Sequence, residues 1–273
     1  MITARVGGFD VGEGQPLLLV AGPCVIESAA QALAHARRVK ELAARHGLPV
    51  VFKASFDKAN RSSVKSFRGV GLEAGLAAFE AVKRETGLAC LTDVHEVWQA
   101  EPCGKVVDVL QVPAFLCRQT DLVMACARHG KAVNVKKGQF LAPKEMRHAV
   151  KKCREAGNPN VFLTERGASF GYGNLVVDMR GLVQMRELGV PVCFDATHSV
   201  QLPGAGGDVT GGERQFVAPL SRAAAAAGID ALFMEIHEDP AAAKSDGPNS
   251  LDFAQADQVL AEVIAIRRAL GQR

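Results

Sequence analysis

The sequence predicts a (β/α)8 barrel, the TIM-barrel fold, because two regularities run through most of its length. Eight apolar, β-rich runs alternate with helical segments, and continuous apolar strands are typical of a buried parallel sheet. Six helical segments end in a Gly that is followed closely by the next apolar run. Short turns therefore lead into the strands, whereas long polar connections at 55–69, 196–213 and 237–250 lead out of them. Barrels of this kind carry their chemistry on the outgoing connections.

The first sixteen residues stand apart from the alternating pattern. They hold two short β-like pieces around Gly-Gly and Gly-Glu-Gly turns, which predicts an N-terminal β-hairpin over residues 1–16. A length of 273 residues fits one large α/β domain or two small ones. Eight strand–helix units in a row favour one barrel domain over residues 1–273, with the hairpin as an extension.

The eight predicted strands follow the hairpin in order. They are LLLVAG (17–22), PVVFKA (49–54), LACLTD (88–93), VDVLQV (107–112), AVNVKK (132–137), NVFLTE (160–165), VPVCFD (190–195) and DALFME (230–235). Segments between them, such as 29–47 and 212–228, have apolar residues at helical spacing. A Gly just past a helix end adopts the left-handed cap conformation cheaply, which we expect at Gly47, Gly87, Gly130, Gly157, Gly189 and Gly228.

An open, doubly wound sheet is the alternative fold for such an alternation. It is less favoured because no Gly-rich dinucleotide turn follows the first strand, where the sequence AGPCVIES stands instead. In a closed barrel, polar side chains at the ends of all eight strands should converge on one mouth.

Composition excludes several classes of function. A formal net charge of +3, with one Trp and one Tyr, argues against nucleic acid binding. No signal peptide and no apolar run of membrane-spanning length is present, so no membrane is expected and the cytoplasm is the predicted location. The chain has seven cysteines, an odd number, and none of them forms a CxxC pair, which indicates free thiols that lie mostly in the core. They are Cys24, Cys90, Cys103, Cys117, Cys126, Cys153 and Cys193.

The connection after the second strand begins with KASFDKANRSS, residues 53–63. It offers Lys53, Lys58 and Arg61 against the single acid Asp57, with small polar side chains between them. Lysine supplies a point charge and arginine a planar fork of donors matched to phosphate or carboxylate. The alternative is a solvated basic loop.

Further cations stand at other strand ends. Together they exceed what one small anion requires, and they predict a pair of substrates that carry phosphate and carboxylate: Lys53, Lys58, Arg61, Arg118, Lys136 and Arg166. Some of these cations could instead form ion pairs with Asp93, Glu165 or Asp195 and only shape the pocket.

A second group comprises Cys24, His198, Glu235 and Asp246, which follow the first, seventh and eighth strands. The first and last strands of a closed barrel are neighbours, so these residues can meet. Thiolate, imidazole and two carboxylates suit a divalent metal of borderline softness. The alternatives are a cysteine that only packs and a histidine that satisfies a buried hydrogen bond.

Seven strings at these strand ends resemble the 3-deoxy-D-manno-octulosonate-8-phosphate synthase family. They are AGPCVIES, FKASFDKANRSS, QVPAFLCRQTDL, NVKKGQF, LTERGASFGYGNLVVDMR, FDATHSVQLPG and SDGP. The resemblance implies a barrel, a homotetramer, and the condensation of phosphoenolpyruvate with arabinose 5-phosphate. KANRSS separates the family from the related heptulosonate-phosphate synthases, which use erythrose 4-phosphate and remain an alternative.

Site residues are carried over from the resemblance. It implies a phosphoenolpyruvate site of Lys53, Ser55, Lys58, Gln111, Ala114 (through its backbone), Lys136, Arg166 and His198. It implies an arabinose 5-phosphate site of Asn60, Arg61, Ser62, Asp93 and Arg118, the last reaching across a subunit interface.

Family members with Cys after the first strand depend on a metal, whereas those with Asn there do not. Cys24 therefore implies a divalent Fe, Zn, Mn or Co ion on Cys24, His198, Glu235 and Asp246. The catalytic candidates are Lys136, His198 and Asp246, and the general base stays open between the last two. Two other readings remain: a Schiff-base aldolase that uses Lys53 or Lys136, and a non-catalytic phosphosugar-binding barrel.

Overall fold

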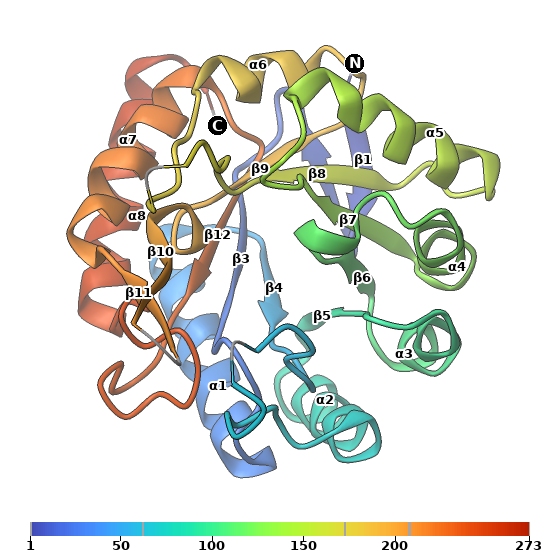
Figure 1. Ribbon diagram of the computed structural model, residues 1–273. Coiled ribbons are helices and arrows are strands. Elements are labelled where there is room, and N and C mark those ends of the chain that lie inside the picture. Colours follow the sequence, from blue (N-terminus) through green and yellow to red (C-terminus); the bar gives the residue numbers. More distant parts are fainter. Residues whose placement is uncertain (1, 62, 172, 207–208, 273) are drawn as a thin grey trace.

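Eight parallel strands close into a barrel in the computed structural model, which describes residues 2–61, 63–171, 173–206 and 209–272. The strands run in chain order around the barrel, and the last pairs with the first (Figure 1). They are β3 (Leu18–Gly22), β4 (Val50–Lys53), β5 (Ala89–Asp93), β6 (Val109–Val112), β7 (Ala132–Lys136), β8 (Val161–Glu165), β9 (Val192–Asp195) and β12 (Ala231–Glu235). Each lies within its predicted run, so the barrel prediction is confirmed.

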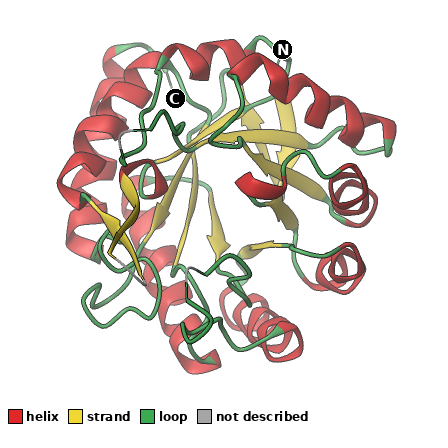
Figure 2. Cartoon of the chain, in the orientation of Figure 1, coloured by secondary structure: helices red, strands yellow, loops and turns green. Residues whose placement is uncertain are grey.

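Helices surround the barrel (Figure 2). They are α1 (Ala29–His46), α2 (Leu72–Thr86), α3 (Ala100–Val106), α4 (Thr120–His129), α5 (Arg147–Glu155), α6 (Arg180–Arg186), α7 (Val217–Ala227) and α8 (Phe253–Ala269). The first and last are the longest, and each begins at a side-chain cap, Ser28 or Asp252. No helix in the described ranges has the length and apolarity needed to cross a membrane.

The N-terminal hairpin is confirmed and consists of β1 (Thr3–Val6) and β2 (Phe9–Gly12). Its buried side chains Ala4, Val6 and Val11 pack against barrel-interior residues such as Leu18 and Val51 near the strand starts. The hairpin therefore closes the amino-terminal mouth of the barrel, and the carboxyl-terminal mouth is left for polar side chains.

Five of the six helix-ending glycines have a positive φ: Gly47, Gly87, Gly157, Gly189 and Gly228. Gly47 and Gly87 adopt the predicted left-handed cap conformation, whereas Gly228, at φ 95° and ψ 102°, lies outside it. The prediction is wrong for Gly130, which is extended at φ −80° and ψ 141°. A Cβ there would lie 2.8 Å from the carbonyl oxygen of Cys126 and 2.9 Å from that of Ala132. Lack of space, and not backbone handedness, requires glycine at this position.

The connection 196–213 is more ordered than the sequence indicated. It holds an antiparallel hairpin, β10 (Gln201–Gly206) and β11 (Val209–Gly212), preceded by the short 3-10 helix η4 (His198–Val200). A second 3-10 helix, η5 (Arg214–Phe216), follows and leads into α7. The hairpin stands at the carboxyl-terminal mouth beside the connection that follows β12 (Figure 1).

Candidate active site

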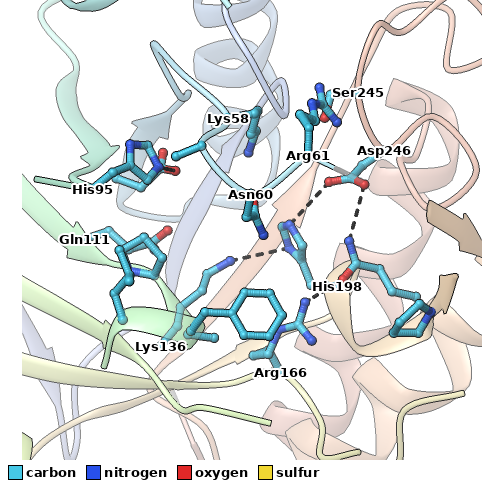
Figure 3. Close-up of a pocket in the computed structure, with 18 of the residues that line it drawn as sticks. Lys58, Asn60, Arg61, His95, Gln111, Lys136, Arg166, His198, Ser245 and Asp246 are labelled. Atoms are coloured by element: carbon cyan, nitrogen blue, oxygen red, sulfur yellow. Dashed lines mark hydrogen bonds and ion pairs between the residues drawn. The ribbon is translucent and has the colours of Figure 1, made fainter. Parts of the chain in front are cut away.

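A cavity of about 570 Å³ opens at the carboxyl-terminal mouth of the barrel (Figure 3). Connections that follow β4, β5, β6, β7, β8, β9 and β12 all contribute to its lining. Eleven of the predicted site residues line it: Lys53, Lys58, Asn60, Arg61, Asp93, Gln111, Ala114, Lys136, Arg166, His198 and Asp246. The barrel thus brings together polar side chains that are up to about 190 positions apart in the chain (53 to 246).

Five predicted residues are not in that lining. Cys24, Ser55 and Glu235 are buried beneath it, and Arg118 is exposed outside it. Ser62 lies outside the described residues. The hydroxyl of Ser55 is buried and has no hydrogen-bond partner among the described residues.

The predicted metal ligands converge. One ligand atom from each of Cys24, Glu235 and Asp246 lies within 4.8 Å of the other two. The Cys24 Sγ is 3.2 Å from Asp246 Oδ2. His198 Nε2 lies 3.5 Å from Glu235 Oε1 and 3.7 Å from Asp246 Oδ2. Ligand atoms bonded tetrahedrally to one metal ion are separated by about 3.3–3.8 Å, so these spacings suit a single ion.

Two observations test whether a cation fits there. Glu235 is fully buried and its Oε2 has no hydrogen-bond partner among the described residues, so a buried acceptor is left over. The donor set of one sulfur, one imidazole nitrogen and two carboxylates is typical of Fe, Zn, Mn or Co. Both observations fit a divalent transition metal.

The charges of the predicted metal ligands and of the lysines near them shift one another's pKa values. Burial, and then the charge of Glu235, raise the pKa of the Cys24 thiol well above its usual range. Burial alone would also raise the pKa of Glu235, but His198, Lys53 and Lys58 outweigh it and bring that pKa to about 2. A thiolate ligand at Cys24 therefore requires a bound cation, and binding would release a proton.

Asp246 has an unusual backbone. Its φ of 50° is the only positive value for a non-glycine residue in the described part of the chain. Its carbonyl oxygen accepts hydrogen bonds from the backbone N–H and the hydroxyl of Ser250, both at 3.0 Å. Aspartate tolerates this region better than most residues, and such outliers concentrate at functional positions.

Asp195 joins two of the catalytic candidates. Its Oδ2 lies 2.6 Å from Lys136 Nζ and 2.8 Å from His198 Nδ1. The contact with Nδ1 turns Nε2 of His198 toward Glu235 and Asp246, as in carboxylate–histidine–metal arrangements. Figure 3 shows His198 beside Asp246. Burial works against the charge of Asp195, but His198 and Lys136 hold its pKa far below the usual range. The sequence predicts Asp195 only as an ion-pair partner, whereas the structure places it between Lys136 and His198.

Lys136 is fully enclosed by the site. Its ammonium lies 4.2 Å from the centre of the Phe233 ring as well as beside Asp195. Burial lowers the pKa of Lys136, and the charge of Asp195 opposes that effect. Lys136 therefore forms an ion pair with Asp195, one of the carboxylates named in the ion-pair alternative, and it also lines the cavity.

Lys53 and Lys58 differ in their partners. Lys53 Nζ donates to Glu235 Oε1 at 2.9 Å and to the carbonyl oxygen of Cys24 at 3.1 Å. Lys58 forms no ion pair with a carboxylate of the described residues. Burial lowers the pKa of Lys58, yet the negative charges of Asp93, Glu235 and Asp246 raise it overall, so the ammonium stays charged.

Two arginines also lack a carboxylate partner among the described residues. Arg61 donates to the carbonyl oxygens of Phe67 at 3.0 Å and Lys244 at 3.4 Å. Arg166 donates to Gln201 Oε1, and its buried Nη1 has no partner among the described residues. Together with Lys58, these guanidinium groups are the cavity cations best suited to bind an anion.

Two further cavity residues were not predicted as site residues. His95 Nε2 lies 3.0 Å from Asp93 Oδ2, while Nδ1 of the ring and Oδ1 of Asp93 are buried without partners among the described residues. Gln201 contacts both Arg166 and Asp246. His95 stands two positions after Asp93 at a strand end, a signal the sequence does carry, whereas Gln201 follows the strand by six residues and carries none.

The floor between β6, β7 and β8 is a chain of buried polar side chains. Gln111 Nε2 donates to Asn134 Oδ1 at 2.8 Å, and Asn134 Nδ2 donates to Thr164 Oγ1 at 2.8 Å. This chain fixes the orientation of the Gln111 amide, because the opposite orientation would place like groups against each other.

Comparisons with known proteins agree with one another. The DAHP synthetase I family matches residues 2–270. The chain is 56% identical to a 2-dehydro-3-deoxyphosphooctonate aldolase of Syntrophotalea carbinolica, over 97% of this chain and 95% of the relative. It is 56% identical to the aldolase of the same name from a Synechococcus species, over 100% and 96%. Another from Cupriavidus necator is 57% identical, over 94% and 91%.

Proposed function

Because the chain belongs to the 2-dehydro-3-deoxyphosphooctonate aldolase family, also called 3-deoxy-D-manno-octulosonate-8-phosphate synthases, we propose that it catalyses that family's condensation. Phosphoenolpyruvate, D-arabinose 5-phosphate and water would give 3-deoxy-D-manno-octulosonate 8-phosphate and inorganic phosphate. The observation that carries this proposal is the cavity itself. It combines several cations that lack carboxylate partners with a convergent metal-ligand set at one barrel mouth.

Phosphoenolpyruvate is assigned to the inner part of the cavity. Its carboxylate and phosphate would lie among the cations and the polar floor, with the residues Lys53, Ser55, Lys58, Gln111, Ala114, Lys136, Arg166 and His198 around them. Carbon 3 must attack the aldehyde while water adds at carbon 2, after which the phosphate leaves by C–O cleavage. The cations lower the repulsion between two anionic substrates and hold the reacting carbons close together.

The metal would be held by Cys24, His198, Glu235 and Asp246. When bound, a divalent ion of this kind polarises a carbonyl oxygen or lowers the pKa of a water molecule. Asp195 keeps the ring of His198 in the ligating orientation. His198 and Asp246 are also the candidates for the general base, and Lys136 carries a positive charge to the place where phosphoenolpyruvate reacts.

The second substrate is assigned to the outer rim, with Asn60, Arg61 and Asp93 around it and Ser62 outside the described residues. Arg118 is exposed and absent from its own cavity lining, which supports a role in the cavity of another copy within a homotetramer. A cytoplasmic location is part of the same proposal, and the seven buried, free cysteines support it.

A substrate-pair assay tests the function. We expect phosphate release from phosphoenolpyruvate to require arabinose 5-phosphate, with erythrose 4-phosphate at least about tenfold less effective in kcat/KM, because a phosphate held at Arg61 sets the distance to the aldehyde. Equal or better activity with erythrose 4-phosphate would assign the protein to the heptulosonate synthases. No phosphate release with either aldose would indicate a binding protein, and borohydride trapping on Lys53 or Lys136 would indicate a Schiff-base aldolase.

Substitution of Arg61 separates the two substrate sites. We expect Arg61→Ala to raise the KM for arabinose 5-phosphate by about 10- to 100-fold, the cost of one charge-assisted hydrogen-bonding group. The KM for phosphoenolpyruvate should change less than about threefold. Steady-state kinetics with each substrate varied in turn would measure both. The matched control is Arg68→Ala in the same connection, because Arg68 is exposed, pairs with Asp57 and does not line the cavity. Equal increases in both KM values would contradict the role of Arg61.

A further inference from the structure

Gln201 lies between two parts of the site that come from different connections. Its Oε1 accepts a hydrogen bond from Arg166 Nη2, and its Nε2 donates to Asp246 Oδ1 at 3.3 Å. The side chain is buried at 8% exposure and lines the cavity. One amide therefore connects an arginine assigned to phosphoenolpyruvate with a carboxylate assigned to the metal.

The amide is suited to this position in a way that other side chains are not. It presents an acceptor to the guanidinium and a donor to the carboxylate, so both contacts are favourable at once. The opposite orientation would set N–H groups against the guanidinium and an oxygen against the carboxylate, and both contacts would be repulsive. Arg166 can only donate hydrogen bonds and the Asp246 carboxylate can only accept them. Because Gln201 bonds to both, a change in the position of one of these side chains alters the hydrogen bond to the other.

The backbone around Gln201 is firmly anchored. Val200 and Glu213 are hydrogen-bonded at the base of the β10–β11 hairpin, at 2.9 Å. Arg214 donates to the carbonyl oxygen of Gly247, next to Asp246. At Gly212, a Cβ would lie 1.6 Å from the Oδ1 of Asn249, so the hairpin base and the connection after β12 are packed without space between them. The backbone at Gln201 is therefore held in place by its neighbours. A shift of the Arg166 guanidinium would move the Gln201 side chain, and with it the Asp246 carboxylate, and would not be absorbed by the backbone.

We propose that Gln201 is a positioning residue that couples the binding of phosphoenolpyruvate to the binding of the divalent metal. When the anion draws the Arg166 guanidinium into place, the amide holds Asp246 in its ligating orientation. By thermodynamic reciprocity the metal then raises the affinity for phosphoenolpyruvate by the same factor. This inference rests on the proposed function, since it uses the substrate and the metal assigned there.

Calorimetry can measure the coupling without turnover. Mn²⁺ is titrated into metal-free protein in the presence and absence of phosphoenolpyruvate, with no aldose added. We expect phosphoenolpyruvate to lower the Kd for Mn²⁺ by about fivefold or more in the unaltered protein. In Gln201→Met, which has neither donor nor acceptor, the two Kd values should agree within about twofold. Gln201→Asn keeps the amide on a shorter side chain that cannot span both partners, and it should lose the coupling as well.

The matched control is Gln215→Met on the neighbouring η5, where the glutamine is exposed and, within the described part of the chain, its side chain donates to Glu213. This variant should keep the coupling of the unaltered protein. A coupling that persists in both Gln201 variants, or that is absent from the unaltered protein while each ligand binds, would overturn the inference and leave the proposed function standing. Failure of the unaltered protein to bind Mn²⁺ would overturn the metal site and the inference together.

Discussion

Replacement of Asp195 by asparagine is expected to lower kcat by about 100-fold or more. Asp195 is fully buried and balances two cations, because Lys136 Nζ and His198 Nδ1 both contact its Oδ2. Asparagine keeps the shape but removes the charge that balances both cations. If its oxygen takes the place of Oδ2, its NH₂ faces the backbone N–H of His198, which donates to Oδ1 of Asp195 at 3.0 Å. In the opposite orientation its NH₂ faces both Lys136 and His198. Loss of a carboxylate behind a ligating histidine costs about 10- to 100-fold in metal affinity or activity. Misplacement of Lys136 adds to that loss.

Several measurements decide whether this explanation is correct. Steady-state kcat should fall while the variant still folds, which a thermal melt checks, since an uncompensated buried charge costs about 3–5 kcal/mol. The Kd for Mn²⁺ should rise by about tenfold or more, because Nε2 of His198 is no longer oriented toward Glu235 and Asp246. The matched control is Asp178→Asn, an exposed carboxylate paired with Arg180 outside the cavity, which should change neither quantity. A kcat within about fivefold of the unaltered protein would show that Asp195 is only a packing group.

The barrel could be predicted because its signal is repeated eight times. Each apolar run contains one strand, and strands such as β3, β7 and β12 are buried along their whole length, as continuous apolar runs predict. The meeting of Cys24 with Glu235 also followed from topology, since closure pairs β12 with β3 and sets Glu235 beside Gly22. The alternation of apolar runs and helical segments defines where each strand ends and which strands are neighbours. The meeting of Cys24 with Glu235 depends only on these two properties, so the sequence could predict it.

Other parts of the site depend on side-chain direction, which the pattern does not contain. The contact of Lys53 with Glu235 and the position of Asp195 between Lys136 and His198 require knowledge of rotamers across the barrel mouth. The β10–β11 hairpin was missed because its glycine-rich sequence has low strand propensity, so it reads as a loop. Gln201 lies on that hairpin, so its contacts with Arg166 and Asp246 could not be predicted without the position of the hairpin.

Removal of the divalent metal is expected to have an equally large effect. Chelation should lower turnover by about 100-fold or more, and Mn²⁺, Co²⁺ or Fe²⁺ should restore it. Cys24, Glu235 and Asp246 hold their ligand atoms within 4.8 Å of one another, and the second oxygen of Glu235 has no other partner among the described residues. Burial holds the Cys24 thiol in its protonated form until a cation is present, so metal binding should also release protons and weaken as the pH falls.

Two readouts keep this prediction independent of catalysis. A metal that binds the folded protein at about 100 times its Kd stabilises it by about 2.7 kcal/mol, so the melting temperature should rise with Mn²⁺ concentration. Cys24→Ala should abolish both that rise and the proton release, whereas Cys103→Ala, a buried cysteine outside the cavity, should keep them. Unchanged turnover in protein verified to be free of metal would refute the requirement. In that case the ammonium of Lys53, which donates to Glu235 Oε1 at 2.9 Å, would take the place of the metal in balancing the charge of Glu235.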